Sequence, residues 1–330
     1  MVKEKIKNKR IVINAKDLLE KEIPPVEYWV EDIIPKKGLV YCFGSPGSFK
    51  TNFLMWMALK GCNGEDVFEF KTKPFRTLWW DEENREVGMR DKLKKLSIGM
   101  GIEENIENIQ IVVSDDFNVL LPEYIDVLEK EIIKFKPDIV IIDSIAKIFP
   151  HDESDSKFVK RIFTQLNPLI TRHNVTFILI HHARKHTSFN GVKQMSRDME
   201  DMSGSREFAA MADSVLLVEK LGSGKYMLKQ VKNRYADDVY SEDFEVSGDE
   251  GEIVVSYGGK SKDKYLLKQF EIEDAIMNWV NVEKLDVFER GQCITAMDKL
   301  GYKKSNVDKA LKNMRNNRLE HQYGIYSLKK

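Results

Sequence analysis

The sequence predicts an α/β fold: a mostly parallel sheet with helices on both faces, an antiparallel extension of that sheet, and a small C-terminal domain. Two observations predict the sheet. The strand-like runs are apolar throughout rather than alternating, and segments with helical spacing of apolar residues separate them. The extension is predicted because, from residue 213 onward, strand-like runs are joined by glycine turns without intervening helices.

The expected elements begin with an apolar run at 38–44 that ends in glycine, followed by a segment with helical spacing at 51–62. Helical patterns at 122–135 and 156–172 lie among the later strands. The other expected parallel strands lie in TLWWDEEN (77–84), NIQIVVSDD (108–116), KPDIVIIDS (136–144) and VTFILIHHARK (175–185). The antiparallel strands are expected in DSVLLVEK (213–220), GKYMLKQVKNR (224–234) and DFEVSGDEGEIVVSYG (243–258).

The composition is that of an ordinary globular protein. Of 330 residues, 42% are hydrophobic and 32% are charged, which excludes wholesale disorder. The net charge of −1 means that any surface for nucleic acid must be local. The three cysteines form no C-x-x-C pair, and no apolar run approaches the roughly 18 to 20 residues that span a bilayer. We therefore expect a cytoplasmic protein with no membrane partner.

Changes in composition and in the spacing of apolar residues along the chain predict four parts. Residues 1–27 form a charged, irregular lead-in. The main α/β domain is expected at 28–257, and the stretch GGKSKDK at 258–264 suits a linker. Residues 265–330 form the separate C-terminal domain.

The stretch GSPGSFKT (44–51) matches the phosphate-loop pattern G-x-x-x-x-G-K-[ST], except that Phe49 replaces the last glycine. In such a loop, backbone N–H groups surround phosphates, the lysine neutralises their oxygens, and the hydroxyl binds Mg²⁺. A glycine turn without a ligand is the alternative. We expect Phe49 to be able to replace the usual glycine if its φ is negative and its ring points away from the phosphates. The expected ATP-binding residues are Gly44, Ser45, Pro46, Gly47, Ser48, Phe49, Lys50, Thr51 and Asn52.

Carboxylates follow two of the predicted strands. Asp143 ends an apolar run, where it would hold Mg²⁺ together with Thr51; a carboxylate that only caps a strand is the alternative. Hydrolysis also needs a base near the γ-phosphate. Asp81, Glu82 and Glu83 compete for this role, and we prefer Glu83, with solvated charge at a strand end as the alternative.

Two further pairs of polar residues lie at strand ends. His182 is expected to sense the γ-phosphate through a hydrogen bond. Metal ligation by His181 and His182 is an alternative, although no third ligand lies near them in sequence, and a buried core residue is the alternative for His181. Lys232 and Arg234 end another strand-like run, and solvated cations are the alternative interpretation. An oligomeric ATPase needs a cation delivered across a subunit boundary, and these two are the best-placed candidates.

Together these motifs resemble the RecA-like hexameric ATPases, with the strongest similarity to the RepA-like replicative helicases of plasmids, phages and archaeal mobile elements. The resemblance covers residues 28–235 and rests on GSPGSFKT, TLWWDEEN, PDIVIIDS, ILIHHARK, GSREFAAMADSVLLVEK and QVKNR, in that order. It implies ATP and Mg²⁺ as cofactors and homo-oligomeric rings, usually hexamers, that grip single-stranded DNA in a central channel. The catalytic residues implied are Glu83, Lys50, His182, Lys232 and Arg234.

The polar segment at 183–206 lies where RecA-like proteins carry a DNA-contacting loop, and disorder without DNA is the alternative. Its candidates for phosphate contact are Arg184, Lys185, Lys193 and Arg197.

The C-terminal domain carries a basic helix followed by a hairpin. Ser305 and Asp308 fit a capping box, and an apolar stripe follows at helical spacing. Helices followed by a hairpin resemble a winged helix, which would contact duplex DNA or, alternatively, another protein. The candidate DNA-contacting residues are Lys309, Lys312 and Arg315.

The function expected from these observations is that of an Mg-ATP-dependent, oligomeric RecA-like DNA motor, a replicative helicase of a mobile element. A DNA-dependent ATPase that does not unwind, such as a recombinase-like or loader protein, is the first alternative. An ATP-gated DNA-binding regulator is the second.

Overall fold

The computed structural model describes residues 13–102, 105–114, 116–145, 147–148, 156–182, 210–236, 240–261, 264–315, 319–322 and 325–328. The chain divides into two compact units, Met1–Gly258 and Gly259–Lys330.

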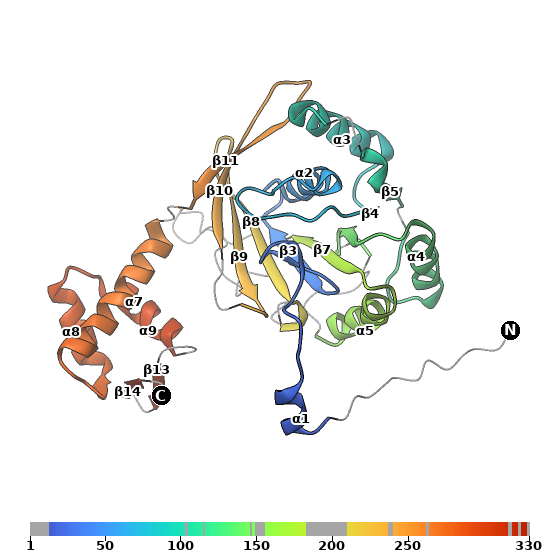
Figure 1. The fold of residues 1–330 in the computed structure, drawn as a ribbon. Helices are drawn as coiled ribbons and strands as arrows, with labels where there is room; N and C mark the ends of the chain where they lie inside the picture. The colour runs from blue at the N-terminus through green and yellow to red at the C-terminus, as the bar shows by residue number, and fades with distance from the viewer. Residues whose placement is uncertain are drawn as a thin grey trace. The chain divides into compact units, whose positions relative to one another are not determined.

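The first unit is built on a nine-stranded sheet with the order β11-β10-β9-β8-β3-β7-β6-β4-β5 (Figure 1). The pairings from β5 to β8 are parallel, whereas β9 is antiparallel to both β8 and β10. This confirms the predicted α/β fold with a mostly parallel sheet and an antiparallel extension. The strands are β3 (Leu39–Gly44), β4 (Thr77–Asp81), β5 (Ile109–Val113), β6 (Ile139–Asp143), β7 (Thr176–His182), β8 (Ser214–Gly222), β9 (Lys225–Asn233), β10 (Ser241–Ser247) and β11 (Val254–Lys260).

Helices cover both faces of this sheet. The side chains of successive strand residues point to opposite faces, so β3 contributes Val40 and Cys42 to one core and Tyr41 and Phe43 to the other. The first core includes residues of α2 and α3, and the second includes residues of α4 and α5 (Figure 1). These helices are α2 (Lys50–Asn63), α3 (Glu86–Met100), α4 (Pro122–Phe135) and α5 (Ser156–His173).

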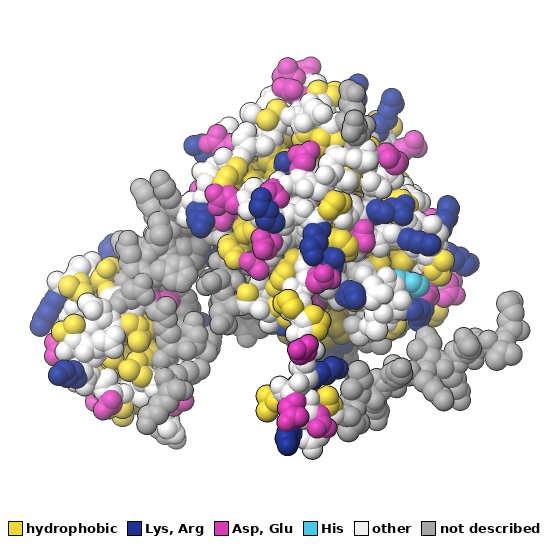
Figure 2. All heavy atoms as spheres, in the orientation of Figure 1, with side chains coloured by type: hydrophobic (Ala, Val, Ile, Leu, Met, Phe, Trp, Pro, Cys, Tyr) yellow, Lys and Arg dark blue, Asp and Glu magenta, His cyan; other side chains and the backbone are white. Residues whose placement is uncertain are grey.

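Shorter elements complete the first unit. Helix α1 (Ala15–Glu20) buries none of its residues. Strands β1 (Tyr28–Val30) and β2 (Ile34–Pro35) form a two-stranded sheet, and η1 (Ile106–Asn108) leads into β5. On the face of this unit drawn in Figure 2, acidic and basic side chains are interspersed. None of the described helices is both long and apolar enough to cross a membrane.

The described residues of the second unit form three helices and a three-stranded sheet with the order β12-β14-β13. Its core includes the predicted apolar stripe, since Val307, Leu311 and Met314 are buried. The expected capping box is wrong: Ser305 lies inside α9, and the Asp308 carboxylate accepts hydrogen bonds from Arg290. The elements are α7 (Lys264–Val282), β12 (Val287–Glu289), α8 (Arg290–Lys299), α9 (Lys304–Met314), β13 (Leu319–Gln322) and β14 (Ile325–Leu328).

Candidate nucleotide site and cation pair

The glycine-rich segment connects the end of β3 to the start of α2, at the carboxyl ends of the parallel strands. A Cβ atom at Gly44 would lie 2.1 Å from the carbonyl oxygen of Val218, so only glycine fits there. Gly47 has a φ of 76° and open space around it. The loop leads directly into the N-terminus of the 14-residue helix α2, and the free backbone N–H groups at a helix N-terminus favour the binding of anions.

Phe49 departs from the expected geometry. Its φ is +75°, in the left-handed region, and not negative as expected. The half-buried ring packs against two rings of the antiparallel extension, with centroid distances of 5.2 Å to Tyr226 and 6.3 Å to Phe244. A left-handed conformation costs a non-glycine residue roughly 1–2 kcal/mol. These ring contacts offset that cost, which explains how phenylalanine occupies a position where the pattern has glycine.

Lys50 is buried and folds back onto the loop. Its Nζ donates to the carbonyl oxygens of Gly44 (3.0 Å) and Ser45 (2.9 Å). Burial lowers the pKa of this ammonium group, and the negative charges of Asp143 and Glu83 act in the opposite direction. The hydroxyl of Ser48, also buried, has no hydrogen-bond partner among the described residues. An anion in the loop would supply acceptors for both groups.

Thr51, near the start of α2, and Asp143, the last residue of β6, meet at the carboxyl edge of the sheet. The Thr51 hydroxyl donates to Oδ2 of Asp143 at 2.7 Å, whereas the buried Oδ1 has no partner among the described residues. Burial is the main cause that raises the pKa of Asp143 to about 7, and the charges of Asp81 and Glu83 act in the same direction. No cluster of three His, Cys, Asp or Glu side chains suits a metal ion in the described part of the chain. The site fits Mg²⁺ that also binds phosphate oxygens, because this ion binds through one or two protein oxygens plus substrate phosphates.

The three acids after β4 have different environments. Asp81 accepts from the backbone N–H of Glu83 (3.0 Å) and from the side-chain amide of Asn84 (2.9 Å). Glu82 is buried and accepts from Trp80 Nε1 at 2.7 Å. Glu83 is exposed, and its charge acts on the pKa of both Lys50 and Asp143. The structure thus brings Lys50, Asp143 and Glu83 to one edge of the sheet.

The histidines end β7 beside the loop. The backbone of His182 pairs in register with Gly44, and its side chain lies outside the described part of the structure. His181 is buried, with its ring 5.8 Å from that of Tyr41.

Lys232 and Arg234 lie at the other end of the sheet. Because β9 is antiparallel to β8, its end returns to the amino ends of the parallel strands. The backbone N–H of Arg234 donates to the carbonyl of Asp213, whose own N–H donates to the carbonyl of Leu39, the first residue of β3. The loop begins at the last residue of β3, roughly 16 Å farther along the strand. The structure therefore does not bring this cation pair to the loop of its own subunit.

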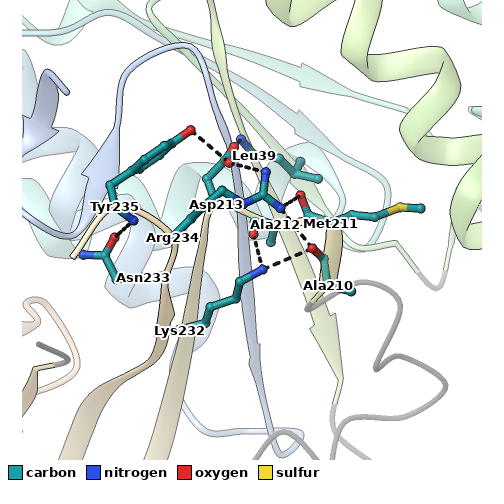
Figure 3. A network of polar contacts seen from close by, with 9 residues as sticks. All are labelled: Leu39, Ala210, Met211, Ala212, Asp213, Lys232, Asn233, Arg234 and Tyr235. Carbon is teal, nitrogen blue, oxygen red and sulfur yellow. Dashed lines mark hydrogen bonds and ion pairs between the residues drawn. The ribbon is translucent and has the colours of Figure 1, made fainter. Parts of the chain in front are cut away.

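The cation pair makes several polar contacts within its own subunit (Figure 3). Lys232 Nζ donates to the carbonyls of Ala212 (2.7 Å) and Ala210 (3.1 Å). Arg234 donates through Nη2 to the carbonyls of Ala210 (3.0 Å) and Met211 (3.2 Å). Burial lowers the pKa of Lys232, and the charge of Arg234 lowers it further.

The candidate DNA-contacting residues divide into two groups. Lys309 and Lys312 are carried by α9, and Arg315 Nη2 donates to the hydroxyl of Tyr326 at 2.7 Å. The residues of the 183–206 segment lie outside the described residues; they are Arg184, Lys185, Lys193 and Arg197.

The fold and the phosphate loop together are those of a P-loop nucleotide-binding protein. Residues 7–188, more than half of the chain, match the family described as AAA domain, and the chain belongs to this family. A solved structure of an ATPase domain is 16% identical, with a TM-score of 0.50, over 66% of this chain and 85% of that one. This similarity supports the fold.

Two other solved structures are similar at lower TM-scores. The crystal structure of the RadB recombinase has a TM-score of 0.47 and 18% identity, over 66% of this chain and 90% of that one. A KaiC-like protein of the archaeon Pyrococcus horikoshii has a TM-score of 0.48 and 19% identity, over 70% of this chain and 99% of that one. No curated protein matches the sequence significantly.

Proposed function

We propose that the protein is an Mg-ATP-dependent, ring-forming DNA motor, a replicative helicase of a mobile element, that hydrolyses ATP at subunit interfaces. The position of the cation pair carries this proposal. Lys232 and Arg234 lie at the opposite end of the sheet from their own phosphate loop, so they serve a nucleotide only if another copy of the chain holds it. A closed ring gives every subunit such a neighbour.

In the proposed reaction, Lys50 leaves the loop carbonyls and binds the phosphates of ATP. Thr51 and Asp143 would hold Mg²⁺, which neutralises charge on the phosphate oxygens. Glu83 orients a water molecule for in-line attack on the γ-phosphate and accepts its proton, while the bond from the γ-phosphorus to the bridging oxygen breaks and ADP leaves. The partner subunit's Arg234 and the partner subunit's Lys232 stabilise the charge that develops on the γ-phosphate.

His182 would report the state of the γ-phosphate to the segment that follows it. We propose that this segment contacts single-stranded DNA through Arg184, Lys185, Lys193 and Arg197. Pairing of the His182 backbone with Gly44 supports this role, because it places the end of β7 beside the residue at which the phosphate loop begins.

For the second unit we propose a winged helix that contacts duplex DNA through Lys309, Lys312 and Arg315. The order helix, strand, two helices and a hairpin supports this assignment. Replacing Lys309 and Lys312 with alanine should weaken duplex binding uniformly across sequences and lower the salt slope by about one unit per phosphate contact. Unchanged affinity and salt slope would favour a protein-contact role instead.

Subunit mixing tests the motor proposal. Arg234→Ala and Lys50→Ala should each be inactive as pure proteins, because removing a finger arginine costs about 10³–10⁵ in kcat and the loop lysine is needed to bind ATP. A mixture should recover activity, since a Lys50→Ala subunit still offers its cation pair to an intact loop next to it. A mixture as inactive as its components would refute catalysis across the interface. Strand separation on forked DNA, with molecular mass measured in the presence of nucleotide, then tests unwinding and ring formation.

One observation favours a second function, that of a recombinase-like ATPase that forms filaments. Helix α1 precedes the main domain and buries none of its residues, and the apolar side chains of Leu18, Leu19 and Ile23 in and after it are exposed. An exposed apolar segment of this kind suits docking onto an adjacent subunit of a filament. DNA-stimulated hydrolysis without strand separation, together with open assemblies of increasing mass, would favour this second function.

A further inference from the structure

Asp213 connects the cation pair to the strand that carries the phosphate loop. Its carboxylate accepts from the backbone N–H of Leu39 at 2.9 Å, from Arg234 Nη1 at 2.9 Å and from the hydroxyl of Tyr235 at 3.1 Å (Figure 3). Its side chain is only 11% exposed. The backbone of Asp213 also bonds to Leu39 and to Arg234. The carboxylate is therefore fixed to the first residue of a fully buried strand.

These contacts use only some of the N–H donors of the Arg234 guanidinium group. Of its five N–H donors, one is directed at Asp213 and two at the carbonyls of Ala210 and Met211. The remaining two have no acceptor among the described residues, and the side chain is 44% exposed. The guanidinium can thus bind an additional anion without leaving Asp213.

Asp213 also allows two cations to lie close together. Lys232 and Arg234 both contact the carbonyl of Ala210, and the charge of Arg234 lowers the pKa of Lys232. The negative charge of Asp213 acts in the opposite direction on that pKa. Without it, two mutually repelling side chains would share one short stretch of backbone.

We propose that Asp213 is a positioning residue that holds Arg234 in the geometry in which it reaches the phosphates of ATP bound to a neighbouring subunit. This inference rests on the proposed function. A long arginine side chain stabilises the developing charge better when its rotamer is fixed before ATP is hydrolysed. A misplacement of a catalytic group by 1 Å can lower the rate by about 10²-fold.

The test compares Asp213→Asn with a matched control, both as full-length protein with DNA. The amide keeps an acceptor for Leu39 but removes the charge that holds Arg234. We expect kcat for ATP hydrolysis to fall roughly 10- to 100-fold while KM for ATP stays unchanged, since the loop of each subunit is intact. The control is Glu129→Gln, which removes the carboxylate that pairs with Arg172 and His173 between α4 and α5. It should retain the wild-type kcat.

Mixing with Lys50→Ala separates positioning from a merely structural role. Asp213→Asn subunits should recover activity in that mixture, as is also expected for Arg234→Ala subunits, because the defect then lies on the cation side of the interface. Rescue of Arg234→Ala without rescue of Asp213→Asn would overturn the inference and leave the proposed function standing. Absence of rescue for both would overturn the proposed function itself. An increase of kcat in Asp213→Asn would also overturn the inference, because the carboxylate would then restrain the arginine.

A second variant covers the case in which Asp213→Asn does not fold. Tyr235→Phe removes the hydrogen bond from the Tyr235 hydroxyl to Oδ1 of Asp213, the oxygen that Arg234 also contacts, and leaves all charges in place. We expect a smaller fall in kcat, again with unchanged KM and again rescued in the mixture. An unchanged kcat in Tyr235→Phe, when Asp213→Asn is unfolded, would count against positioning.

Discussion

The left-handed conformation of Phe49 predicts how much Phe49→Ala and Phe49→Gly each lower the free energy of unfolding, and which of the two is the more stable. The ring is half-buried on Tyr226 and Phe244. Truncating a fully buried phenylalanine to alanine costs about 3–5 kcal/mol, and the half-buried ring with its two aromatic contacts places Phe49 at the lower end of that range. Phe49→Ala should therefore lower the free energy of unfolding by about 3 kcal/mol. Phe49→Gly loses the same contacts but relieves about 1 kcal/mol of backbone strain, so its loss should be about 2 kcal/mol.

The sign of the difference between these two variants is the decisive quantity. At a negative φ, alanine would be more stable than glycine by about 0.5–1 kcal/mol, because glycine loses more conformational freedom on folding. At the observed φ of +75°, glycine should be the more stable variant by about 1 kcal/mol. Urea unfolding of both variants, followed by tryptophan fluorescence of the first unit, measures this difference. If Phe49→Ala proves more stable than Phe49→Gly, the left-handed assignment is refuted.

Three further predictions concern the nucleotide site. Lys50→Ala should abolish ATP binding measured by calorimetry, because the loop then lacks its only ammonium group; tight binding by the variant would remove the phosphate-loop assignment. Glu83→Gln should bind ATP with unchanged affinity and lose nearly all turnover in a phosphate-release assay, whereas normal turnover would move the base to Asp81 or Glu82. The pKa of Asp143 is raised to about 7, so the nucleotide-free protein should lose stability as the pH rises from about 4 through 7, by an amount on the order of a few kcal/mol. Over the same range the affinity for Mg-ATP should rise, because the metal needs the ionised carboxylate, and Asp143→Asn should show neither trend.

The parallel strands are predictable because each is buried on both faces and is therefore apolar along its whole length. Helix α4 spans the residues expected for it, 122–135, since a proline in its first turn and a left-handed Lys136 after its last residue mark its ends locally. The site residues at strand ends follow from the same reasoning, because the carboxyl ends of parallel strands share one edge of the sheet. This is how Lys50, Asp143 and Glu83 could be grouped from the sequence.

Contacts between distant segments were not predictable in the same way. The φ of Phe49 depends on ring partners in β9 and β10, which no local pattern around the loop indicates. The place of Arg234 depends on the direction of β9, which the strand-like run itself does not reveal. Asp213 was missed for a related reason: its local signal is only an acid two residues before an apolar run, in ADSVLLV, and its carboxylate has the partners Leu39, Arg234 and Tyr235.

Strand β3 has a mechanical consequence for any assembly of this chain. Its first residue is bonded to Asp213 and its last residue opens the phosphate loop, and all six of its residues are buried. A close-packed interior of this kind does not stretch or bend gradually. In a ring, each subunit would then act as a spacer of constant length between one nucleotide and the next. Changes in nucleotide state would have to appear as rotations of whole subunits at their boundaries rather than as deformation within them.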